Sequence, residues 1–418
     1  MIASNGRLFA RGAALAVTAL VLFACGGSSG GNGGGGQSFK GTKKVGLTTA
    51  ISGTSATFGA AAQNGLQMAV DDVNSKGGVN GYKIQLVVRD DANKPDAATE
   101  NARSLVLEDK VVGLFGPVTS SACLAISPLA KQYKVTFFTF VCNTVNLTTR
   151  KFQPYITSLV PNTVMEGSAI GIDIGKKKQY RTYYVIAPDY EFGHVEADAF
   201  KAALKKTNSD AQIIGEDYPK LGTTDFTSYI TKILAAHPDV VYTNIFSADL
   251  VTFVKQAKPY DFFNKTTFTT QTSIDDLQTL GADFPLNIRG YTRAPFFAIN
   301  TSQAKDYTNR YKSRFGKYPS DWAIMGYDAF NVWAAAANKA GNFDAQKIID
   351  NTVGQSFTTL RGKVTIRKVD HQADVPEWLG TTTQSSEYPF PIYKDVEAVP
   401  GKQLWLSEDE VKKLQAEG

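Results

Sequence analysis

Short apolar runs alternate with longer amphipathic segments along most of the chain, beginning near residue 43. The first run, KVGLT at 44–48, is rich in β-forming residues. In the segment that follows, 58–75, apolar side chains recur with helical spacing at Leu66, Ala69, Val70 and Val73. A glycine-rich break at 76–81 separates this segment from the next apolar run. The pattern predicts a strand followed by a helix.

The same alternation continues through the first two thirds of the chain and restarts after Pro161. The strands that it predicts are 83–88, 111–115, 135–140, 182–187, 211–216, 239–244 and 266–270. The helices that it predicts are 95–108, 120–133, 164–176, 191–206, 225–236, 248–257 and 275–281. Strands that are continuous apolar runs separated by helices indicate parallel sheets covered on both faces. We therefore expect an α/β fold with two doubly wound units.

The last third of the chain changes character and becomes rich in helices. Periodicity predicts helices at 302–315, 322–340 and 344–351. Helices that come this late must pack on a sheet already built, so we expect this region to return to the first unit. The apolar runs at 363–368 and around 378–380 are interpreted as a final hairpin.

The first 24 residues have the pattern of a secretory signal peptide. They contain Arg7 and Arg11, no acidic residue, and an apolar run at 13–24 that is too short to span a membrane. The residues around Cys25 resemble the lipobox of bacterial lipoproteins, in which this cysteine is acylated; the alternative is an ordinary signal peptide with a chance cysteine. The glycine-rich stretch 26–38 lacks a phosphate-binding motif and is interpreted as a tether.

Composition excludes several classes of protein. The 418 residues are 43% hydrophobic and 20% charged, which is typical of a globular chain and not of a disordered one. The net charge of +5 is too small for a nucleic-acid binder, and two of the positive charges lie in the signal segment. Eight of the 36 glycines lie in the short tether at 26–38, so the glycine excess does not indicate a loose fold.

Cysteine and histidine usage argues against a metal centre. If Cys25 carries lipid, Cys123 and Cys142 remain in an oxidising compartment, where an even pair suggests a disulfide; two free buried thiols are the alternative. Both positions lie at the same edge of the first predicted unit. The three histidines, His194, His237 and His371, are scattered without ligand spacing, so we expect no metal and no cofactor.

No catalytic constellation is visible in the sequence. The acidic pairs 71–72, 90–91 and 275–276 have no partner histidine, and no G-x-S-x-G motif occurs. We therefore expect a binding protein and not an enzyme.

Four segments resemble type I periplasmic-type binding proteins, above all those for leucine, isoleucine, valine and related amides. The segment 51–106 resembles their N-terminal lobe, and GPVTSSACLAISPLAKQYKV (116–135) resembles their ligand-carboxylate segment. DYEFG (189–193) and IRKVDHQADVPEWLG (366–380) resemble a second-lobe motif and a late hairpin. The resemblance extends over residues 43–393.

The resemblance implies two α/β lobes joined by three crossover segments, with a small ligand in the cleft between them. The implied divisions are a signal peptide (1–24), a lipidated Cys25 with its tether (25–39), and a C-terminal tail (406–418). The first lobe would combine 40–159 with 295–358, and the second lobe 160–294 with 359–405.

The resemblance also implies ligand-binding residues at the ends of the strands. Ser120 corresponds to the serine that binds the ligand carboxylate, and Thr119 and Ser121 flank it at a helix start, where a plain N-cap is the alternative. Val141 and Asn143 correspond to contacts with the ligand head group. Asn143 departs from the family pattern, so Thr144 is a substitute candidate.

The aromatic residues Phe58, Tyr190 and Phe246 recur at equivalent strand-to-helix junctions and are expected to form the pocket wall. Amino-acid binders of this family have an acidic residue for the ligand ammonium in the second lobe. The corresponding position here is Thr272, and Asp275 is interpreted as a helix cap. This departure favours an amide, a hydroxyl or an aromatic acid over an α-ammonium group.

The function implied is that of a lipid-anchored binding protein outside the cytoplasmic membrane, on the cell surface or in the periplasm. It would act as a monomer, capture a small carboxylate-bearing solute by lobe closure and deliver it to an ABC permease. The candidate solutes are a branched-chain amino acid, an amide or an aromatic acid. The alternative is a sensor that reports its ligand to a signalling partner; no nucleic-acid partner is expected.

Overall fold

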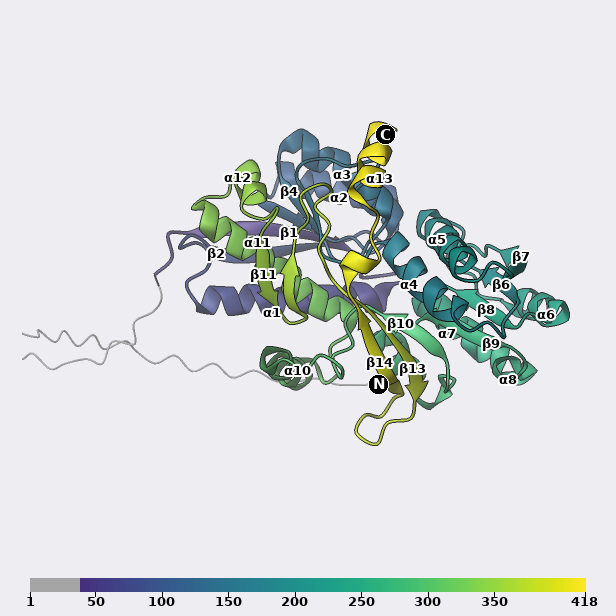
Figure 1. Cartoon of the computed structure of the whole chain (residues 1–418). Helices are drawn as coiled ribbons and strands as arrows, with labels where there is room; N and C mark the ends of the chain where they lie inside the picture. The colour runs from purple at the N-terminus through teal and green to yellow at the C-terminus, as the bar shows by residue number, and fades with distance from the viewer. Residues whose placement is uncertain (1–37) are drawn as a thin grey trace, which may run out of the picture. The chain divides into compact units, whose positions relative to one another are not determined.

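The computed structural model describes residues 38–418, so the predicted signal peptide and Cys25 lie outside the described residues. The first sheet has five parallel strands in the order β2-β1-β3-β4-β5 (Figure 1). Its strands are β1 (Thr42–Thr49), β2 (Lys83–Asp90), β3 (Gly113–Phe115), β4 (Thr136–Thr139) and β5 (Ile156–Ser158). We call the body around this sheet lobe 1.

Helices from both ends of the chain cover lobe 1. The helices are α1 (Ala56–Ser75), α2 (Pro95–Leu107), α3 (Ser120–Tyr133), α10 (Ser302–Phe315), α11 (Asp321–Ala340) and α12 (Ala345–Asp350). In Figure 1 the green helices α11 and α12 lie beside the purple elements of the N-terminal part. The backbones of α1 and α11 approach so closely that a Cβ on Gly65 would lie 2.0 Å from the carbonyl oxygen of Ala323. The return of the late helices to the first unit is thus confirmed.

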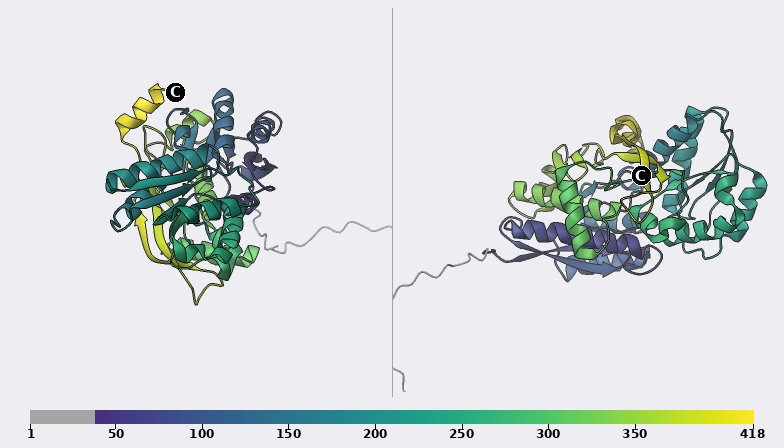
Figure 2. Two further views of the ribbon diagram at one scale, coloured as in Figure 1. Left: turned by 90° about the vertical axis from the view of Figure 1, so that its right-hand side faces the viewer. Right: turned by 90° about the horizontal axis from the view of Figure 1, so that it is seen from below.

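The second sheet has seven strands in the order β14-β13-β10-β9-β8-β6-β7, and we call the body around it lobe 2. Its parallel strands are β6 (Thr182–Ile186), β7 (Gln212–Asp217), β8 (Val240–Thr243), β9 (Thr267–Gln271) and β10 (Arg289–Thr292). Two antiparallel strands, β13 (Glu377–Thr383) and β14 (Ile392–Val399), extend one edge. Figure 2 shows these yellow strands beside the teal ones.

The helices of lobe 2 are α4 (Thr163–Gly175), α5 (Glu191–Thr207), α6 (Thr227–Ala236), α7 (Ser247–Ala257), α8 (Phe262–Lys265) and α9 (Ile274–Leu280). A separate apolar core joins α4 and α5 to the sheet through Met165, Ile174, Phe200 and Tyr242. The C-terminal tail forms one more helix, α13 (Glu408–Ala416), capped by Ser407.

The predicted final hairpin is wrong. The run at 363–368 supplies β12 (Gly362–Thr365), which pairs with β11 (Ser356–Thr359) in a separate two-stranded sheet. The run near 378 supplies β13, which pairs with β10 on one side and β14 on the other. Both partner strands, β11 and β14, carry many polar residues, so hydrophobic patterning did not reveal them.

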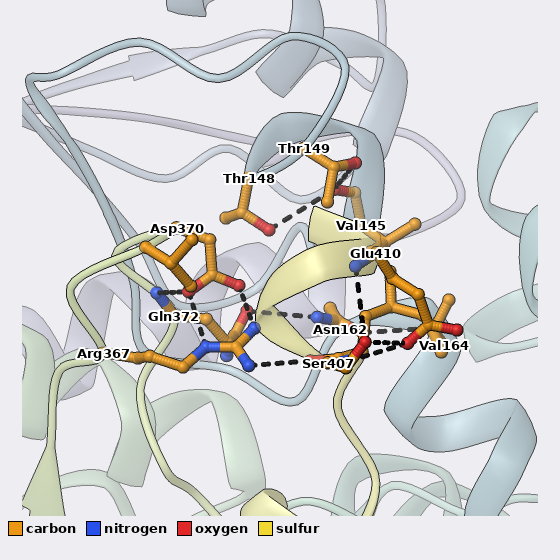
Figure 3. Close-up of polar contacts among 12 residues, drawn as sticks. Val145, Thr148, Thr149, Asn162, Val164, Arg367, Asp370, Gln372, Ser407 and Glu410 are labelled. Carbon is orange, nitrogen blue, oxygen red and sulfur yellow. Dashed lines mark hydrogen bonds and ion pairs between the residues drawn. The ribbon is translucent and has the colours of Figure 1, made fainter. Parts of the chain in front are cut away.

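Three crossover segments join the lobes, after β5, after β10 and after β12, and the first and third are bonded to each other. Ser158 N donates to His371 O at 3.1 Å, and Ala373 N donates to Ser158 O at 2.8 Å. In Figure 3, Asn162 on the first segment lies beside Gln372 on the third, and Arg367 pairs with Asp370. Arg367 also donates to Leu406 O at 2.8 Å, which connects the third segment to the C-terminal part of the chain.

Buried carboxyl groups lie where α9 of lobe 2 meets the start of α11 in lobe 1. Ser273, and not Asp275, caps α9, because its Oγ accepts a hydrogen bond from Asp276 N at 3.1 Å. Asp275 lies buried near Ser320 of lobe 1. Burial raises the pKa of Asp275 and that of Asp276 to about 7. Ile274 N donates to Asp321 Oδ2 at 3.0 Å across the same junction.

These raised pKa values predict that stability falls between about pH 4 and pH 7. The native state retains protons on Asp275 and Asp276 in this window, whereas the unfolded chain has lost them, so raising the pH favours unfolding. The measurement is the free energy of unfolding in urea at pH 5 and at pH 8. We expect the decrease between these pH values to be smaller in Asp276→Asn than in the unmodified protein, by on the order of a few kcal/mol. The exposed Asp210→Asn serves as the control and should follow the unmodified protein. Identical pH dependence in Asp276→Asn and the unmodified protein would contradict the assignment.

Candidate functional site

One cavity lies where carboxyl ends of strands in both sheets meet the helices that follow them. The cavity is narrow, because a water-sized sphere has only about 20 Å³ in which its centre can move. Ligand sites in open parallel sheets form at such strand ends, because helix N-termini present N–H groups there. The residues that line it are Phe58, Val118, Ser120, Val141, Asn143, Tyr190, Phe192, Phe246, Gln271, Arg293 and Trp322.

Ser120 is brought to the cavity by a tight turn after β3. The turn begins at Gly116, whose φ is +91° and where a Cβ would lie 2.0 Å from Thr48 O, so only glycine fits. Ser120 follows as the first residue of α3, buried and lining the cavity. The first turn of a helix of this length attracts an anion, and a serine hydroxyl adds a further donor.

The two cysteines lie directly behind this turn and form a disulfide. Their Cα atoms are 6.4 Å apart, within the range that a disulfide requires. Cys123 comes from the first turn of α3 and Cys142 from the loop after β4. The bond therefore joins the two segments of lobe 1 that carry Ser120 and Asn143.

The loop after β4 supplies Val141 and Asn143 to the cavity. Asn143 Nδ2 donates to Pro161 O at 3.1 Å and to Glu166 Oε2 at 2.7 Å, so its amide group is anchored on the first crossover segment and on α4. The side-chain oxygen Oδ1 is then the acceptor that this amide can offer to a ligand.

Aromatic rings from both lobes form the walls. Phe58 of α1 lies 4.5 Å from Trp322 of α11 and 5.8 Å from Phe246 of lobe 2, measured between ring centroids. Phe246 in turn contacts Phe192 edge-on at 5.6 Å, and Tyr190 lies 6.5 Å from it. The three predicted aromatic residues thus lie together, and Trp322 and Phe192 complete the set.

Sequence reasoning missed Arg293, the one charged side chain among the described residues that line the cavity. It comes directly after β10, forms a two-point ion pair with Glu166 of α4, and donates to Val141 O at 3.1 Å. Its guanidinium also lies 4.6 Å from the centre of the Trp322 ring. β10 is only four residues long and was not predicted, so nothing in the sequence placed Arg293 at a strand end.

Three buried carboxyl groups surround this guanidinium. Glu196 accepts hydrogen bonds from Tyr242, at 3.0 Å, and from Tyr291. Glu377 lies near Glu166 and Glu196. Desolvation raises the pKa of Glu166 in spite of Arg293, and raises the pKa values of Glu196 and Glu377 well above the usual range. Arg293 favours the charged form of Glu166 most directly, because it donates two hydrogen bonds to that carboxylate.

Four predicted ligand residues lie beside the cavity but do not line it. Thr119 is the N-cap residue of α3, and Ser121 is only half-buried on the same helix. Thr144 donates its hydroxyl to Glu191 of lobe 2, so it joins the lobes. Thr272 is buried beyond the end of β9 and donates to Thr270 O at 3.5 Å, whereas its neighbour Gln271 lines the cavity.

Residues 38–418 contain no cluster of three or more His, Cys, Asp or Glu side chains arranged for a metal ion. In the same part of the chain, no helix combines the length and apolarity needed to cross a membrane.

Comparisons with known proteins match this geometry. The family model described as "Periplasmic binding protein" matches residues 42–386. The Leu/Ile/Val-binding protein homolog 7 of Brucella abortus is 27% identical over 324 residues, which cover 73% of this chain and 79% of that protein.

Solved structures of binding proteins share the fold. A periplasmic binding protein from Burkholderia mallei has a TM-score of 0.82 at 22% identity, covering 89% of this chain and 98% of its own. A solute-binding protein of an ABC transporter from Rhodopseudomonas palustris, in complex with 3,4-dihydroxybenzoic acid, has a TM-score of 0.78 at 23% identity. It covers 86% of this chain and 98% of its own.

The fold, the cavity and the family match agree with the resemblance seen in the sequence. The family consists of substrate-binding proteins of transporters and not of enzymes, and its members act outside the cytoplasm. The chain therefore belongs to the periplasmic binding protein family, in its type I, branched-chain amino acid branch.

Proposed function

We propose that this protein is the substrate-binding protein of an ABC importer and captures a small carboxylate-bearing solute by lobe closure. The observation that carries the proposal is the cavity itself, which is lined from both lobes and has Ser120 at the start of α3 on one side. A solute held there bridges the lobes, so its binding energy favours the closed arrangement over an open one.

The ligands for which relatives are named, or with which they were crystallised, support a carboxylate-bearing solute. The Brucella abortus relative is named for leucine, isoleucine and valine, and the Rhodopseudomonas palustris structure holds 3,4-dihydroxybenzoic acid. These ligands share a carboxylate and differ in the rest of the molecule. The candidate solutes for this chain are accordingly a branched-chain amino acid, an amide or an aromatic acid.

The proposed ligand contacts follow the cavity lining. Ser120 and the N-terminal turn of α3 would bind the carboxylate, and Val141 and Asn143 the adjoining part of the ligand. Phe58, Tyr190 and Phe246 would enclose its body.

Polar contacts already join the lobes around the cavity. Asn146 Nδ2 donates to Glu191 Oε1 at 2.9 Å, and Ser247 Oγ donates to Thr54 O at 2.9 Å.

We further propose that the mature protein begins at an acylated Cys25 and is held outside the cytoplasmic membrane by this lipid. The segment 26–38 would serve as the tether, and the bodies 40–159 with 295–358 and 160–294 with 359–405 as the moving lobes. The partner would be an ABC permease in the same membrane, approached by a monomer. A sensor that reports ligand to a signalling protein is the alternative. It uses the same cavity and differs only in the partner.

The first test is ligand binding by the purified protein. A thermal-shift panel of leucine, isoleucine, valine, aliphatic amides and benzoates should contain a carboxylate that raises the melting temperature without turnover. Ser120→Ala should weaken that ligand at least about tenfold, because a hydrogen bond to a charged group contributes about 1.5–3 kcal/mol. Isothermal titration calorimetry measures the loss.

The matched control is Ser127→Ala. Ser127 lies two turns further along α3, is equally buried, and its Oγ has no hydrogen-bond partner among the described residues. Its substitution should leave ligand affinity unchanged. Equal affinities of Ser120→Ala and the unmodified protein would show that the carboxylate binds elsewhere.

The second test concerns the anchor. When the full chain is expressed in a bacterial host, we expect the protein in the membrane fraction and metabolic labelling by palmitate. Cys25→Ala should abolish the labelling and shift the protein to the soluble fraction, because no acyl chain then remains to hold it. Ser28→Ala is the control in the same segment. Membrane retention of Cys25→Ala would refute the lipid anchor.

A further inference from the structure

The charges around the cavity are arranged asymmetrically. Arg293 is the one charged side chain among the described lining residues, and no Asp or Glu lines the cavity. The nearest carboxylate, Glu166, is fully buried behind it, and the side chain of Arg293 is 4% exposed. Two lining residues, Arg293 and Asn143, donate their hydrogen bonds away from the cavity to Glu166. The carboxylate of Glu166 is therefore screened from any ligand by Arg293 and Asn143, which bind it.

An α-amino acid would place an ammonium group in this cavity without an anion to receive it. The position at which the sequence resemblance expects an acidic side chain is Thr272, which does not line the cavity, and the neighbouring lining residue is the neutral Gln271. A buried ammonium without a paired anion loses several kcal/mol of hydration. The positive charge of Arg293 opposes it further.

A carboxylate meets the opposite conditions. The N-terminus of α3 with Ser120 and the guanidinium of Arg293 both favour negative charge in the cavity. The remaining walls are aromatic rings from both lobes, which suit the planar, apolar body of a ligand. The narrowness of the cavity favours a small and flat ligand body.

We propose that the cavity selects a small aromatic carboxylate that lacks an ammonium group, and that Arg293, held by Glu166, is the residue that determines this selectivity. The proposal rests on the proposed function, since it narrows the class of solute captured at the same site. Arg293 is a positioning and electrostatic element, because it donates to Val141 O, shares Glu166 with Asn143, and is itself part of the cavity lining.

The test compares benzoate, benzamide and leucine by isothermal titration calorimetry on the purified protein. Benzamide keeps the ring and removes the charge, whereas leucine keeps the carboxylate and adds an ammonium group. We expect benzoate to bind at least about tenfold more tightly than benzamide and about 100-fold more tightly than leucine.

The possible results distinguish a failure of the selectivity proposal from a failure of the proposed function. If leucine or another amino acid or amide of the panel binds as tightly as benzoate, the selectivity proposal fails and the function of solute capture stands. If no carboxylate of either kind binds, both fail. If benzoate binds most tightly, both are supported.

The role of Arg293 is tested with both charges of the pair removed together, as Arg293→Gln with Glu166→Gln, so that no unpaired charge is left buried. We expect benzoate to weaken at least about tenfold and its preference over leucine to shrink. The matched control is Arg289→Gln with Asp173→Asn, which removes a half-buried two-point ion pair that joins β10 to α4 through residues outside the cavity lining. The control should keep both affinities, and an equal effect of both double variants would overturn the role of Arg293.

If the double variant of Arg293 and Glu166 does not fold, Gln271→Glu provides a second test of the selectivity. This substitution is nearly isosteric and places a carboxylate at the cavity wall. It should weaken benzoate at least about tenfold and strengthen leucine relative to benzoate. An unchanged ratio of the two affinities would overturn the proposal.

Discussion

The ion pair between Arg293 and Glu166 is the interaction around which the cavity is arranged. Arg293 comes from the second crossover segment and Glu166 from α4, and the guanidinium also binds the carbonyl of Val141 in lobe 1 and lies against Trp322 of α11. Removing one partner of such a buried pair costs about 3–5 kcal/mol, because the other charge is left without a counter-ion. One salt bridge thus connects segments that are far apart in the sequence and holds Arg293 in place at the cavity.

The surrounding buried polar groups depend on that pair. Asn143 is oriented by Glu166, and burial raises the pKa values of the nearby Glu196 and Glu377 well above the usual range. The disulfide between Cys123 and Cys142 acts on the same loop, which it joins to the segment that presents Ser120. Rigid walls reduce the ordering cost of ligand binding, and under the proposed function the crossover segments would absorb the rotation of the lobes.

The junction of the lobes away from the cavity has its own chemistry. Asp275 and Asp276 lie buried near Ser320 and Asp321 of lobe 1, and their raised pKa values follow from loss of water. Thr144 and Glu191 form a further contact between the lobes. Polar groups at such a junction favour a reversible contact, because they can be hydrated when the lobes separate.

The sequence alone determined the order of most strands and helices, the two-lobed α/β architecture and the positions of Ser120, Asn143, Phe58, Tyr190 and Phe246 at strand ends. These features follow from local periodicity and from the start of each helix, both of which are encoded in neighbouring residues. Only the tertiary structure placed Arg293 and Trp322 in the cavity, excluded Thr272 from it, and paired β13 with β10 instead of β12. Those outcomes depend on which distant segments meet. They also depend on the direction in which each side chain points at the end of a short strand. Neither is determined by the residues adjacent in the chain.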